Sequence, residues 1–231
     1  YDIIRKPLSD IPIRNFPKQP ILAIRKDAKN TLLIGIDGQG IWNISEKGDT
    51  ILHIYKEDLN NPFSLRGDGV YDILCDGSKN WIATFTGKLS FFENNNSQIT
   101  PVTYQINNPN SLGNNYVNQI IEDHEGHIWF ATNNGVSRWD AASNKWKHYY
   151  QNKSEQAKVF LSLCEDNQGH IWAGSYSSGI YLLDRETGKT LKHYSSKTNT
   201  PGFTGDFIFD FFVDKEGDVW IGGNQKLSCY L

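Results

Sequence analysis

Short apolar runs separated by polar turns fill most of the chain. In EDHEGHIWFATNNGVSRWD (122–140), a polar turn leads into the apolar run IWFA, and the turn NNG then leads into a second run. Two strand-length runs bounded by turn formers are the pattern of a β-hairpin. No stretch shows a convincing period of 3.6 residues, so the pattern favours strands over helices.

This stretch occurs five times along the chain. The apolar anchor after each polar turn is Leu33, Trp81, Trp129, Trp172 or Trp220, at intervals of 48, 48, 43 and 48 residues. Five or six residues before each anchor lies an aspartate: Asp27, Asp76, Asp123, Asp166 and Asp214. Just before the next run comes a glycine: Gly40, Gly87, Gly135, Gly179 and, three residues early, Gly223. A repeat of this length, about 20–50 residues, determines the fold class.

Each copy contains about four strand-length runs. In the third copy they are 117–121, 128–132, 136–139 and 146–150. Four antiparallel strands repeated every 40–50 residues or so are typical of a β-propeller blade. We therefore predict an all-β fold, a β-propeller of about five four-stranded antiparallel blades. Residues 1–231 form a single propeller domain or segment in this prediction, as a closed five-blade ring or as part of a larger propeller.

The repeated residues have structural explanations. Aspartate can hydrogen-bond its own backbone two residues on, and glycine accepts a positive φ without steric cost. The four tryptophan anchors are predicted to fill the space between neighbouring blades. The innermost strands are expected to open at Ile21, Val70, Val117, Phe160 and Ile208.

The two ends of the chain differ from the repeats between them. Residues 1–20 are proline-rich, and we expect them to form a closing strand and a linker. Because the last copy stops after its third strand, residues 1–5 could supply the fourth strand beside 226–231. The alternative is a segment of a longer array with an open side. The chain contains no methionine, so we expect a processed or excised piece.

The segments between copies carry a family resemblance. NNPFSLRGDGVYDI (60–73) and NNPNSLGNNYVNQI (107–120) each precede an acidic turn and a tryptophan-containing run, WIATF or IWFAT. From about residue 21 onward the chain resembles the two-component-regulator propeller repeat. The resemblance implies a non-catalytic periplasmic sensor module of a hybrid two-component histidine kinase of Bacteroides-type bacteria, responding to poly- or oligosaccharide breakdown products. The implied partners are an oligosaccharide, the remaining domains of the parent inner-membrane kinase and, as an alternative, a second copy.

Composition excludes several other classes. The net charge is −3 and there is no Lys/Arg run, so we predict no nucleic-acid partner. No apolar stretch approaches the ~18 residues of a membrane span, so no direct membrane contact is expected of this piece. The three cysteines form no CxxC or Cys/His pattern, and Cys75 and Cys164 are expected to be buried packing residues.

We predict no catalytic residue, no metal site and no cofactor. The adjacent carboxylates Glu122/Asp123 and Glu165/Asp166 lie in the repeated turn and point to opposite faces of a strand, so they cannot share one substrate. The histidines fall mostly at equivalent repeat positions, in separate blades. The alternative functions are a propeller scaffold for protein–protein interaction or dimerisation and, less favoured, a propeller lyase or glycosidase.

Candidate ligand-binding residues are those that do not recur. A sugar site combines aromatic faces with amide and carboxylate side chains in a concave place. In the second turns of the copies these are Asp37, Gln39, Phe85, Asn133, Asn134, Tyr176, Ser177, Asn224 and Gln225. Near the starts of inner strands, Asp68, Asn118 and Asp206 could line a central channel. The alternative is that all of them are solvated turn residues.

Overall fold

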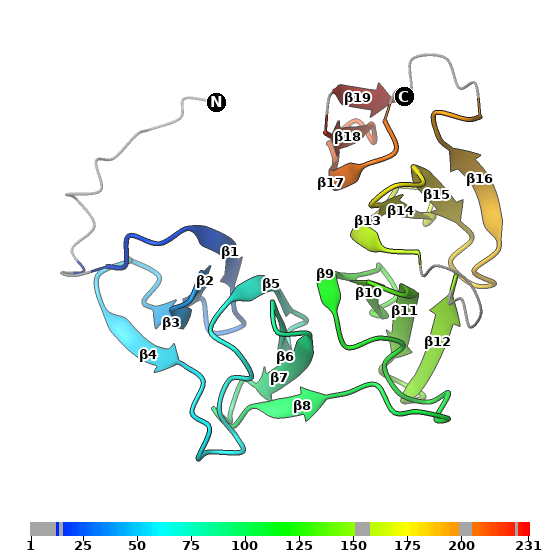
Figure 1. The fold of residues 1–231 in the computed structure, drawn as a ribbon. Coiled ribbons are helices and arrows are strands. Elements are labelled where there is room, and N and C mark those ends of the chain that lie inside the picture. Colours follow the sequence, from blue (N-terminus) through cyan, green and yellow to red (C-terminus); the bar gives the residue numbers. More distant parts are fainter. Residues whose placement is uncertain (1–12, 14–15, 151–157, 199–204, 225) are drawn as a thin grey trace. The chain divides into compact units, whose positions relative to one another are not determined.

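A computed structural model describes residues 13, 16–150, 158–198, 205–224 and 226–231. Every regular element in these ranges is a β-strand, and the strands form five antiparallel sheets (Figure 1). The chain divides into two compact units, Tyr1–Pro101 and Val102–Leu231. The prediction that residues 1–231 form a single propeller domain stays a prediction.

The first unit contains two four-stranded sheets. Sheet 1 consists of β1 (Ile21–Lys26), β2 (Leu32–Ile36), β3 (Gly40–Ile44) and β4 (Ile51–Tyr55). Sheet 2 consists of β5 (Val70–Cys75), β6 (Lys79–Thr84), β7 (Lys88–Glu93) and β8 (Thr100–Val102). In both sheets the strand order follows the sequence, as in a β-meander.

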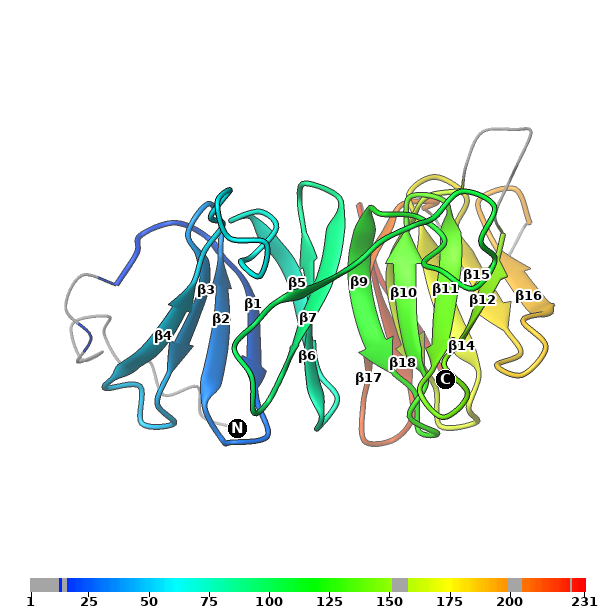
Figure 2. The same cartoon turned by 90° about the horizontal axis from the view of Figure 1, so that it is seen from below.

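The second unit contains the other three sheets. Sheet 3 consists of β9 (Val117–Glu122), β10 (Ile128–Thr132), β11 (Gly135–Asp140) and β12 (Lys145–Tyr149). Sheet 4 consists of β13 (Phe160–Glu165), β14 (Ile171–Ser175), β15 (Ile180–Leu183) and β16 (Thr190–Tyr194). Among the described residues, sheet 5 consists of β17 (Ile208–Val213), β18 (Val219–Gly223) and β19 (Leu227–Tyr230). Figure 2 shows short turns joining the strands at both ends of the sheets.

The strand predictions are confirmed. The four strands of the third copy lie within one residue of their predicted bounds, and the five inner strands begin at the predicted residues. The last copy does end after three strands. The proposed closing strand, residues 1–5, lies outside the described residues, and its pairing stays a prediction.

One aspartate organises each polar turn. In sheet 3, Asp123 Oδ1 accepts hydrogen bonds from the backbone N–H groups of Glu125 (3.0 Å) and His127 (2.9 Å). The Oδ2 atom of Asp123 accepts a hydrogen bond from Trp129 Nε1 at 2.8 Å. Gly126 completes the turn with a φ of 80°. The predicted backbone role of the aspartate is confirmed, and the spacing of five or six residues also brings its second oxygen to the indole.

The other anchors repeat this bond. Indole Nε1 donates to the turn aspartate in Trp81–Asp76 (2.8 Å), Trp172–Asp166 (2.9 Å) and Trp220–Asp214 (2.7 Å). In sheet 1 the anchor Leu33 has no side-chain N–H group, and Thr31 Oγ1 donates to Asp27 Oδ2 at 2.8 Å instead. The aspartate is therefore satisfied in every copy, with or without a tryptophan.

The predicted burial of the anchors holds for all but the last. Leu33 and Trp129 are completely buried, and Trp81 and Trp172 are at most 2% exposed. Trp220 is 37% exposed, so the prediction that it fills a space between two blades is wrong. Trp220 pairs with Phe212 of the neighbouring strand, and Phe212 is also exposed, at 66%.

Adjacent sheets within a unit pack through apolar faces. Trp129 of sheet 3 lies in one cluster with Phe160, Leu163 and Ala173 of sheet 4. Trp172 of sheet 4 lies in a cluster with apolar residues of sheet 5, Ile208, Phe211, Val219 and Ile221. Burying one tryptophan side chain in such a cluster contributes about 3–5 kcal/mol to folding.

In the first unit, an N-terminal segment covers one face of sheet 1. Ile13 is buried in a cluster with Ile34, Trp42 and Ile44, and the ring of Phe16 contacts Trp42 edge-on at 5.4 Å. The opposite side of sheet 1 packs on sheet 2 through a separate cluster that includes Leu33 and Val70. Residues of the first unit therefore cover one face of sheet 1 and part of the other, on which Ile21 and Ile24 of β1 are 45% and 52% exposed.

In three copies, a glycine at the start of the third strand links neighbouring sheets. The N–H of Gly179 donates to the carbonyl of Asp206 at 3.0 Å, and Gly135 and Gly40 make the same bond to Lys158 and Asp68. These residues lie two positions before the next inner strand. Gly179 has a φ of 77°, and a Cβ there would lie 2.0 Å from the carbonyl oxygen of Tyr194.

We expect Gly179→Ala to destabilise the chain in two ways. The positive φ costs about 1–2 kcal/mol for a residue with a Cβ, and the clash with the Tyr194 backbone adds roughly 1–3 kcal/mol. Gly38→Ala is the matched control, because Gly38 has a φ of 64° but nothing within 4 Å of its Cβ position. Urea unfolding of both variants measures the difference, and equal losses would show that the Tyr194 contact is unimportant.

The cysteines are packing residues. Cys75 and Cys164 are half-buried beside the apolar clusters of their sheets, rather than fully buried as expected, and all three cysteines are free. Burial raises the pKa of the Cys75 thiol to about 12 and also raises the pKa of Cys164. Both thiols are therefore protonated, and unreactive, at neutral pH.

Candidate functional site

One backbone hydrogen bond is shared by all five copies at the end of the second strand. The first residue of the second turn donates its N–H to the carbonyl of the residue before the inner strand of its own sheet. The pairs are Asp37–Pro20 (3.0 Å), Phe85–Gly69 (2.9 Å), Asn133–Tyr116 (3.1 Å), Tyr176–Val159 (2.9 Å) and Asn224–Phe207 (3.3 Å). Because the backbone alone makes this bond, the side chain at the position is free to differ from copy to copy.

In the second unit, two amide side chains meet at this level. Asn118, the second residue of β9, donates from Nδ2 to Asn133 Oδ1 at 2.9 Å. The same Nδ2 donates to the carbonyl of Phe160 in sheet 4 at 2.7 Å. The carbonyl of the exposed Tyr116 accepts the N–H of Asn133. The two amides are thus held in fixed positions at the boundary between sheets 3 and 4.

Two aromatic rings follow at the boundary between sheets 4 and 5. The ring of Tyr176 contacts that of Phe207 edge-on, with centroids 4.9 Å apart. Tyr176 is 51% exposed, so one side of its ring is open to a ligand. The exposed Asn224 is bonded through its N–H to the carbonyl of Phe207, which places a further amide next to the aromatic pair.

These groups form one row. Asn118 bonds the carbonyl of Phe160, and Tyr176 bonds the carbonyl of Val159, the preceding residue. Tyr176 in turn contacts Phe207, which bonds Asn224. We call this row the amide–aromatic rim, defined as Tyr116, Asn118, Asn133, Tyr176, Phe207 and Asn224. Flat aromatic surfaces beside fixed amide donors and acceptors suit a ligand rich in hydroxyl groups.

The first unit has a smaller counterpart. The ring of Phe85 lies 3.7 Å from that of Tyr71, and both are 40% exposed. Gly69 is needed beside them, because a Cβ there would lie 2.4 Å from the Phe85 ring. Asp37 is exposed, and Gln39 accepts a bond from Lys56 Nζ at 3.3 Å. The two units are described separately, so these residues are not joined to the rim.

The other predicted residues have varied surroundings. The N–H of Asn134 donates to Thr132 Oγ1 at 3.1 Å, and Ser177 is exposed. Asp68 accepts the N–H of Glu57 at 2.7 Å, and Asp206 accepts two bonds from Ser196. Gln225 lies outside the described residues. Whether any of these residues binds a ligand stays a prediction.

Sequence reasoning missed Tyr116 and Phe207. Both lie just before an inner strand, where the other copies have Pro20, Gly69 and Val159. An aromatic residue at this position in two copies, where the other three copies have none, is the sequence feature that could have identified them. Tyr116 and Phe207 are far in sequence from the second-turn residues Asn133 and Asn224 that they bond. The repeat pattern does not reveal these backbone hydrogen bonds.

The opposite end of sheets 3 and 4 carries an ionic cluster. Arg185 donates to Glu125 at 2.6 Å and lies 3.5 Å from Glu165. The Nδ1 atom of His124 lies 2.5 Å from Glu165 Oε1. The buried Arg138, whose guanidinium lies over the Trp129 ring, donates to the carbonyl of Arg185 at 2.9 Å. These contacts join two sheets, and we assign them a structural role.

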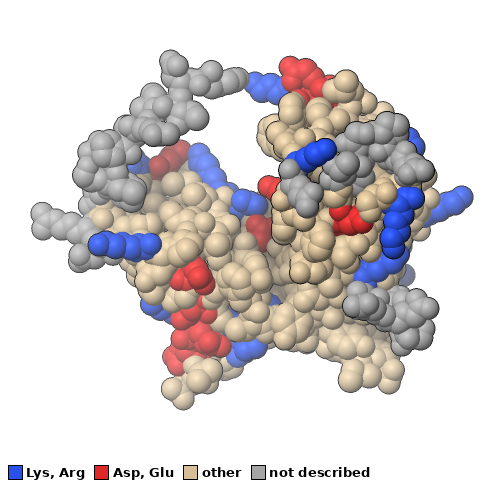
Figure 3. Space-filling model, turned by 45° about the horizontal axis from the view of Figure 1, so that its top comes forward, with Lys and Arg blue, Asp and Glu red and all other residues tan. Residues whose placement is uncertain are grey.

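Charge is interspersed on the face shown in Figure 3, where Lys and Arg side chains lie in small separate groups among Asp and Glu. Among the described residues no three His, Cys, Asp or Glu side chains are grouped closely enough to hold a metal ion. The described ranges also contain no helix long and apolar enough to cross a membrane.

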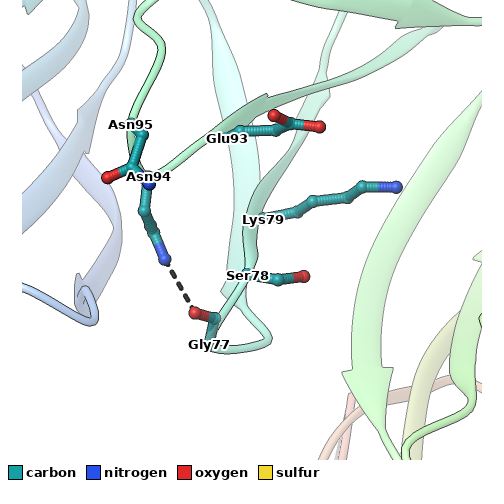
Figure 4. Close-up of a pocket in the computed structure, with 6 residues that line it drawn as sticks. All are labelled: Gly77, Ser78, Lys79, Glu93, Asn94 and Asn95. Atoms are coloured by element: carbon teal, nitrogen blue, oxygen red, sulfur yellow. Dashed lines mark hydrogen bonds between the residues drawn. The ribbon is translucent and has the colours of Figure 1, made fainter.

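Two surface pockets lie in the first unit, and none of the predicted site residues lines them. One, of about 370 Å³, is lined by Gly77, Ser78, Lys79, Glu93, Asn94 and Asn95 (Figure 4). Asn94 Nδ2 donates to the Gly77 carbonyl at 2.7 Å across it. The other, of about 380 Å³, lies along β4 and the loop that follows it. The first has no exposed aromatic face beside its polar groups, unlike the rim.

Three segments of the chain match a known repeat family, the two component regulator propeller: residues 111–134, 154–177 and 202–225. All three lie in the second unit, and each contains an inner strand, the aspartate turn and the second strand. The rim residues fall within these segments. Comparison with curated proteins gave no match.

The chain resembles solved structures to different degrees. The extracellular domain of a hybrid two component system from B. thetaiotaomicron is 21% identical, with a TM-score of 0.76 over 91% of this chain and 28% of that chain. The extracellular domain of a one component system from the same organism gives 20% identity and a TM-score of 0.49, covering 91% of this chain and 36% of the other. PorZ of Porphyromonas gingivalis, a surface component of the type-IX secretion system, is 13% identical, with a TM-score of 0.48. The match covers 91% of this chain and 38% of PorZ.

The chain thus spans 28% of the length of the first of these structures, and its likeness to that structure is one of fold. The five antiparallel sheets of three or four strands agree with it. The chain therefore has a β-propeller fold, and three segments of its second unit match the two component regulator propeller repeat.

Proposed function

We propose that this chain is a ligand-recognition module in the extracytoplasmic sensor part of a two-component signalling protein. In this proposal it binds poly- or oligosaccharide breakdown products at the amide–aromatic rim and catalyses no reaction. The signal then passes to the remaining domains of the parent protein.

The observation that carries the proposal is the composition of the rim. Its side chains are amide and aromatic, and all six lie in segments that match the repeat family. Amides can donate to and accept from sugar hydroxyls, and a tyrosine ring offers an apolar surface to the C–H face of a sugar. The neighbouring Asp206 carboxylate is already bonded to Ser196, at 2.8 Å to its N–H and 2.5 Å to its hydroxyl. This arrangement supports binding rather than acid–base chemistry.

We expect Tyr176→Ala to weaken oligosaccharide binding about 10-fold or more, since a tenfold change corresponds to only about 1.4 kcal/mol of contact energy. Isothermal calorimetry against a panel of neutral and acidic oligosaccharides measures the effect. Tyr104→Ala is the matched control, because Tyr104 is a 44% exposed tyrosine of the same unit that lies outside the rim. Its substitution should leave the affinity unchanged.

Two outcomes would contradict the proposal. Equal loss of affinity in both variants would place the binding elsewhere than at the rim. No binding across the panel, together with a stable dimer in sedimentation, would favour the alternative function, a propeller scaffold for protein–protein interaction.

A further inference from the structure

Every inner strand contains a β-bulge at its second residue. In sheet 3, Ala131 pairs with Gln119 and Thr132 pairs with Val117, so the register skips Asn118. The same skip occurs in the other four sheets, where the skipped residues are Leu22, Tyr71, Leu161 and Phe209. A bulge changes the direction of the side chain at its extra residue, and bulges are frequent next to active sites.

The skipped residue contacts the first residue of the second turn in two copies. In sheet 2 the ring centroids of Tyr71 and Phe85 are 3.7 Å apart, and in sheet 3 Asn118 bonds Asn133 at 2.9 Å. The two positions therefore form a pair whose chemistry differs from copy to copy. The residues at the same two positions of sheets 1, 4 and 5 are Leu22 and Asp37, Leu161 and Tyr176, and Phe209 and Asn224. Sheet 3 alone has an amide at both positions.

Hydrogen bonds fix the orientation of both amides in sheet 3. The carbonyl oxygen of Phe160 can only accept, so the Asn118 atom 2.7 Å from it is the NH₂ group. That NH₂ group also donates to Asn133, whose contacting atom is therefore Oδ1. This leaves one acceptor, Asn118 Oδ1, beside one donor, Asn133 Nδ2. Among the described residues neither atom has a hydrogen-bond partner, and both side chains are partly exposed.

The backbone holds this amide pair in place next to Tyr176. The N–H of Asn133 donates to the carbonyl of Tyr116 at 3.1 Å, and the bulge fixes Asn118. The N–H of Tyr176 donates to the carbonyl of Val159 at 2.9 Å, and Val159 directly precedes the residue that Asn118 bonds. The amide pair and the tyrosine are thus bonded to adjacent peptide groups. A binding group fixed before the ligand arrives loses little conformational entropy on binding.

We propose that Asn118 and Asn133 form a subsite that binds one unsubstituted sugar hydroxyl. A hydroxyl group can donate to Asn118 Oδ1 and accept from Asn133 Nδ2 at the same time. An ammonium group only donates and an ether oxygen only accepts, so each leaves one of the two amide atoms unpaired. The subsite therefore selects a free hydroxyl over a protonated amino group or a methylated hydroxyl. This inference rests on the proposed function and names the sugar group that the rim binds.

The test compares glucose with glucosamine, at a pH at which the amine is protonated, because the two sugars differ only in one hydroxyl. Titrations are followed by the side-chain amide signals of Asn118 and Asn133 in ¹⁵N NMR spectra. We expect glucose to shift both signals in the wild type, and glucosamine to bind no more tightly. Asn133→Asp keeps the acceptor for Asn118 but turns the free donor into a carboxylate oxygen, so the subsite then has two acceptors. The affinity ratio of glucosamine to glucose should rise about 10-fold or more in this variant, because hydrogen bonds between charged groups are about twice as strong as neutral ones.

Asn134→Asp is the matched control, because it adds the same charge to the same turn outside the pair, and its affinity ratio should change far less. An equal change in both variants would overturn the proposal, and so would the absence of any shift of the two amide signals in concentrated glucose. If Asn133→Asp does not fold, Asn118→Leu decides, since sheet 4 has Leu161 at this position. A glucose-induced shift of Asn133 that persists in Asn118→Leu would overturn the proposal.

The outcome is separable from that of the proposed function. If Tyr176→Ala weakens oligosaccharide binding while the amides of Asn118 and Asn133 do not respond to any sugar, the rim is the binding site and the hydroxyl subsite is wrong. If the two amides respond to glucose but Tyr176→Ala binds oligosaccharides normally, the subsite stands and the role of the aromatic ring is wrong.

Discussion

Replacing Trp129 by alanine is expected to lower the free energy of unfolding by about 4–8 kcal/mol. Trp129 is completely buried between sheets 3 and 4, and the cavity left by a buried tryptophan costs about 3–5 kcal/mol. The substitution also removes the indole N–H from Asp123, which leaves a buried carboxylate oxygen with one donor fewer, at roughly 1–3 kcal/mol. Since a domain is stable by only about 5–15 kcal/mol, this one change removes much of the total.

Denaturant unfolding of Trp129→Ala and Trp220→Ala tests whether the loss of stability depends on how deeply the tryptophan is buried. The two tryptophans occupy equivalent positions and make the same bond to an aspartate, but Trp220 is partly exposed. Trp220→Ala is expected to cost less, about 2–3 kcal/mol, because more than a third of the Trp220 side chain remains in contact with water. Trp129→Phe serves if the alanine variant does not fold. Similar losses of unfolding free energy in the two alanine variants would contradict the difference in burial between Trp129 and Trp220.

Replacing Asp123 by asparagine is expected to cost about 2–4 kcal/mol at pH 7, and less in acid. Asp123 accepts bonds from Glu125, His127 and Trp129, and hydrogen bonds to a charged group contribute about 1.5–3 kcal/mol. An asparagine has only one acceptor oxygen, so its NH₂ group would meet one of these donors.

The pH dependence follows from the pKa of this carboxyl. Burial alone would raise the pKa of Asp123, but the hydrogen bonds from Trp129 and His127 outweigh it and hold the pKa below its usual value. The pKa values of Asp76 and Asp214 are lowered as well. For Asp214 the main cause is the bond from Trp220. A carboxyl group whose pKa is lower in the folded state stabilises the fold fully at a pH above its pKa in the unfolded state, about 3.9. This stabilisation is lost as the pH falls through the pKa of the folded state.

Measuring the free energy of unfolding at pH 7 and at pH 3 therefore separates the contribution of the Asp123 charge from that of the shape of its side chain. The difference between wild type and Asp123→Asn should shrink at the lower pH, because the wild-type carboxylate begins to be protonated. Asp140→Asn is the comparison: the hydrogen bonds from Ser143 also lower the pKa of Asp140, but this carboxylate caps an exposed turn and has no tryptophan partner, so its loss at pH 7 should be smaller than that of Asp123→Asn. A difference that is the same at both pH values would mean that the charge of Asp123 contributes nothing.

The candidate site was only partly accessible from the sequence. Asn133 and Tyr176 stood out because they vary at a repeated position, and they do lie at equivalent places in sheets 3 and 4. Phe207 did not stand out, because its contact with Tyr176 joins residues of two different sheets. Periodicity identifies which residues are equivalent, but it says nothing about which equivalent positions in neighbouring sheets touch.

The sequence by itself determined the repeat, the strands and the inner-strand starts, because a four-strand unit with fixed turns is a local pattern. It also singled out the aspartate and the glycine of each turn, whose bonds are made within a few residues. Only the tertiary structure decided how each equivalent residue is used. Trp129 and Trp220 have the same local sequence and the same aspartate bond, yet one is buried and the other exposed. Burial depends on the sheet that lies next to a residue, and a repeat pattern is the same whether or not that sheet is there.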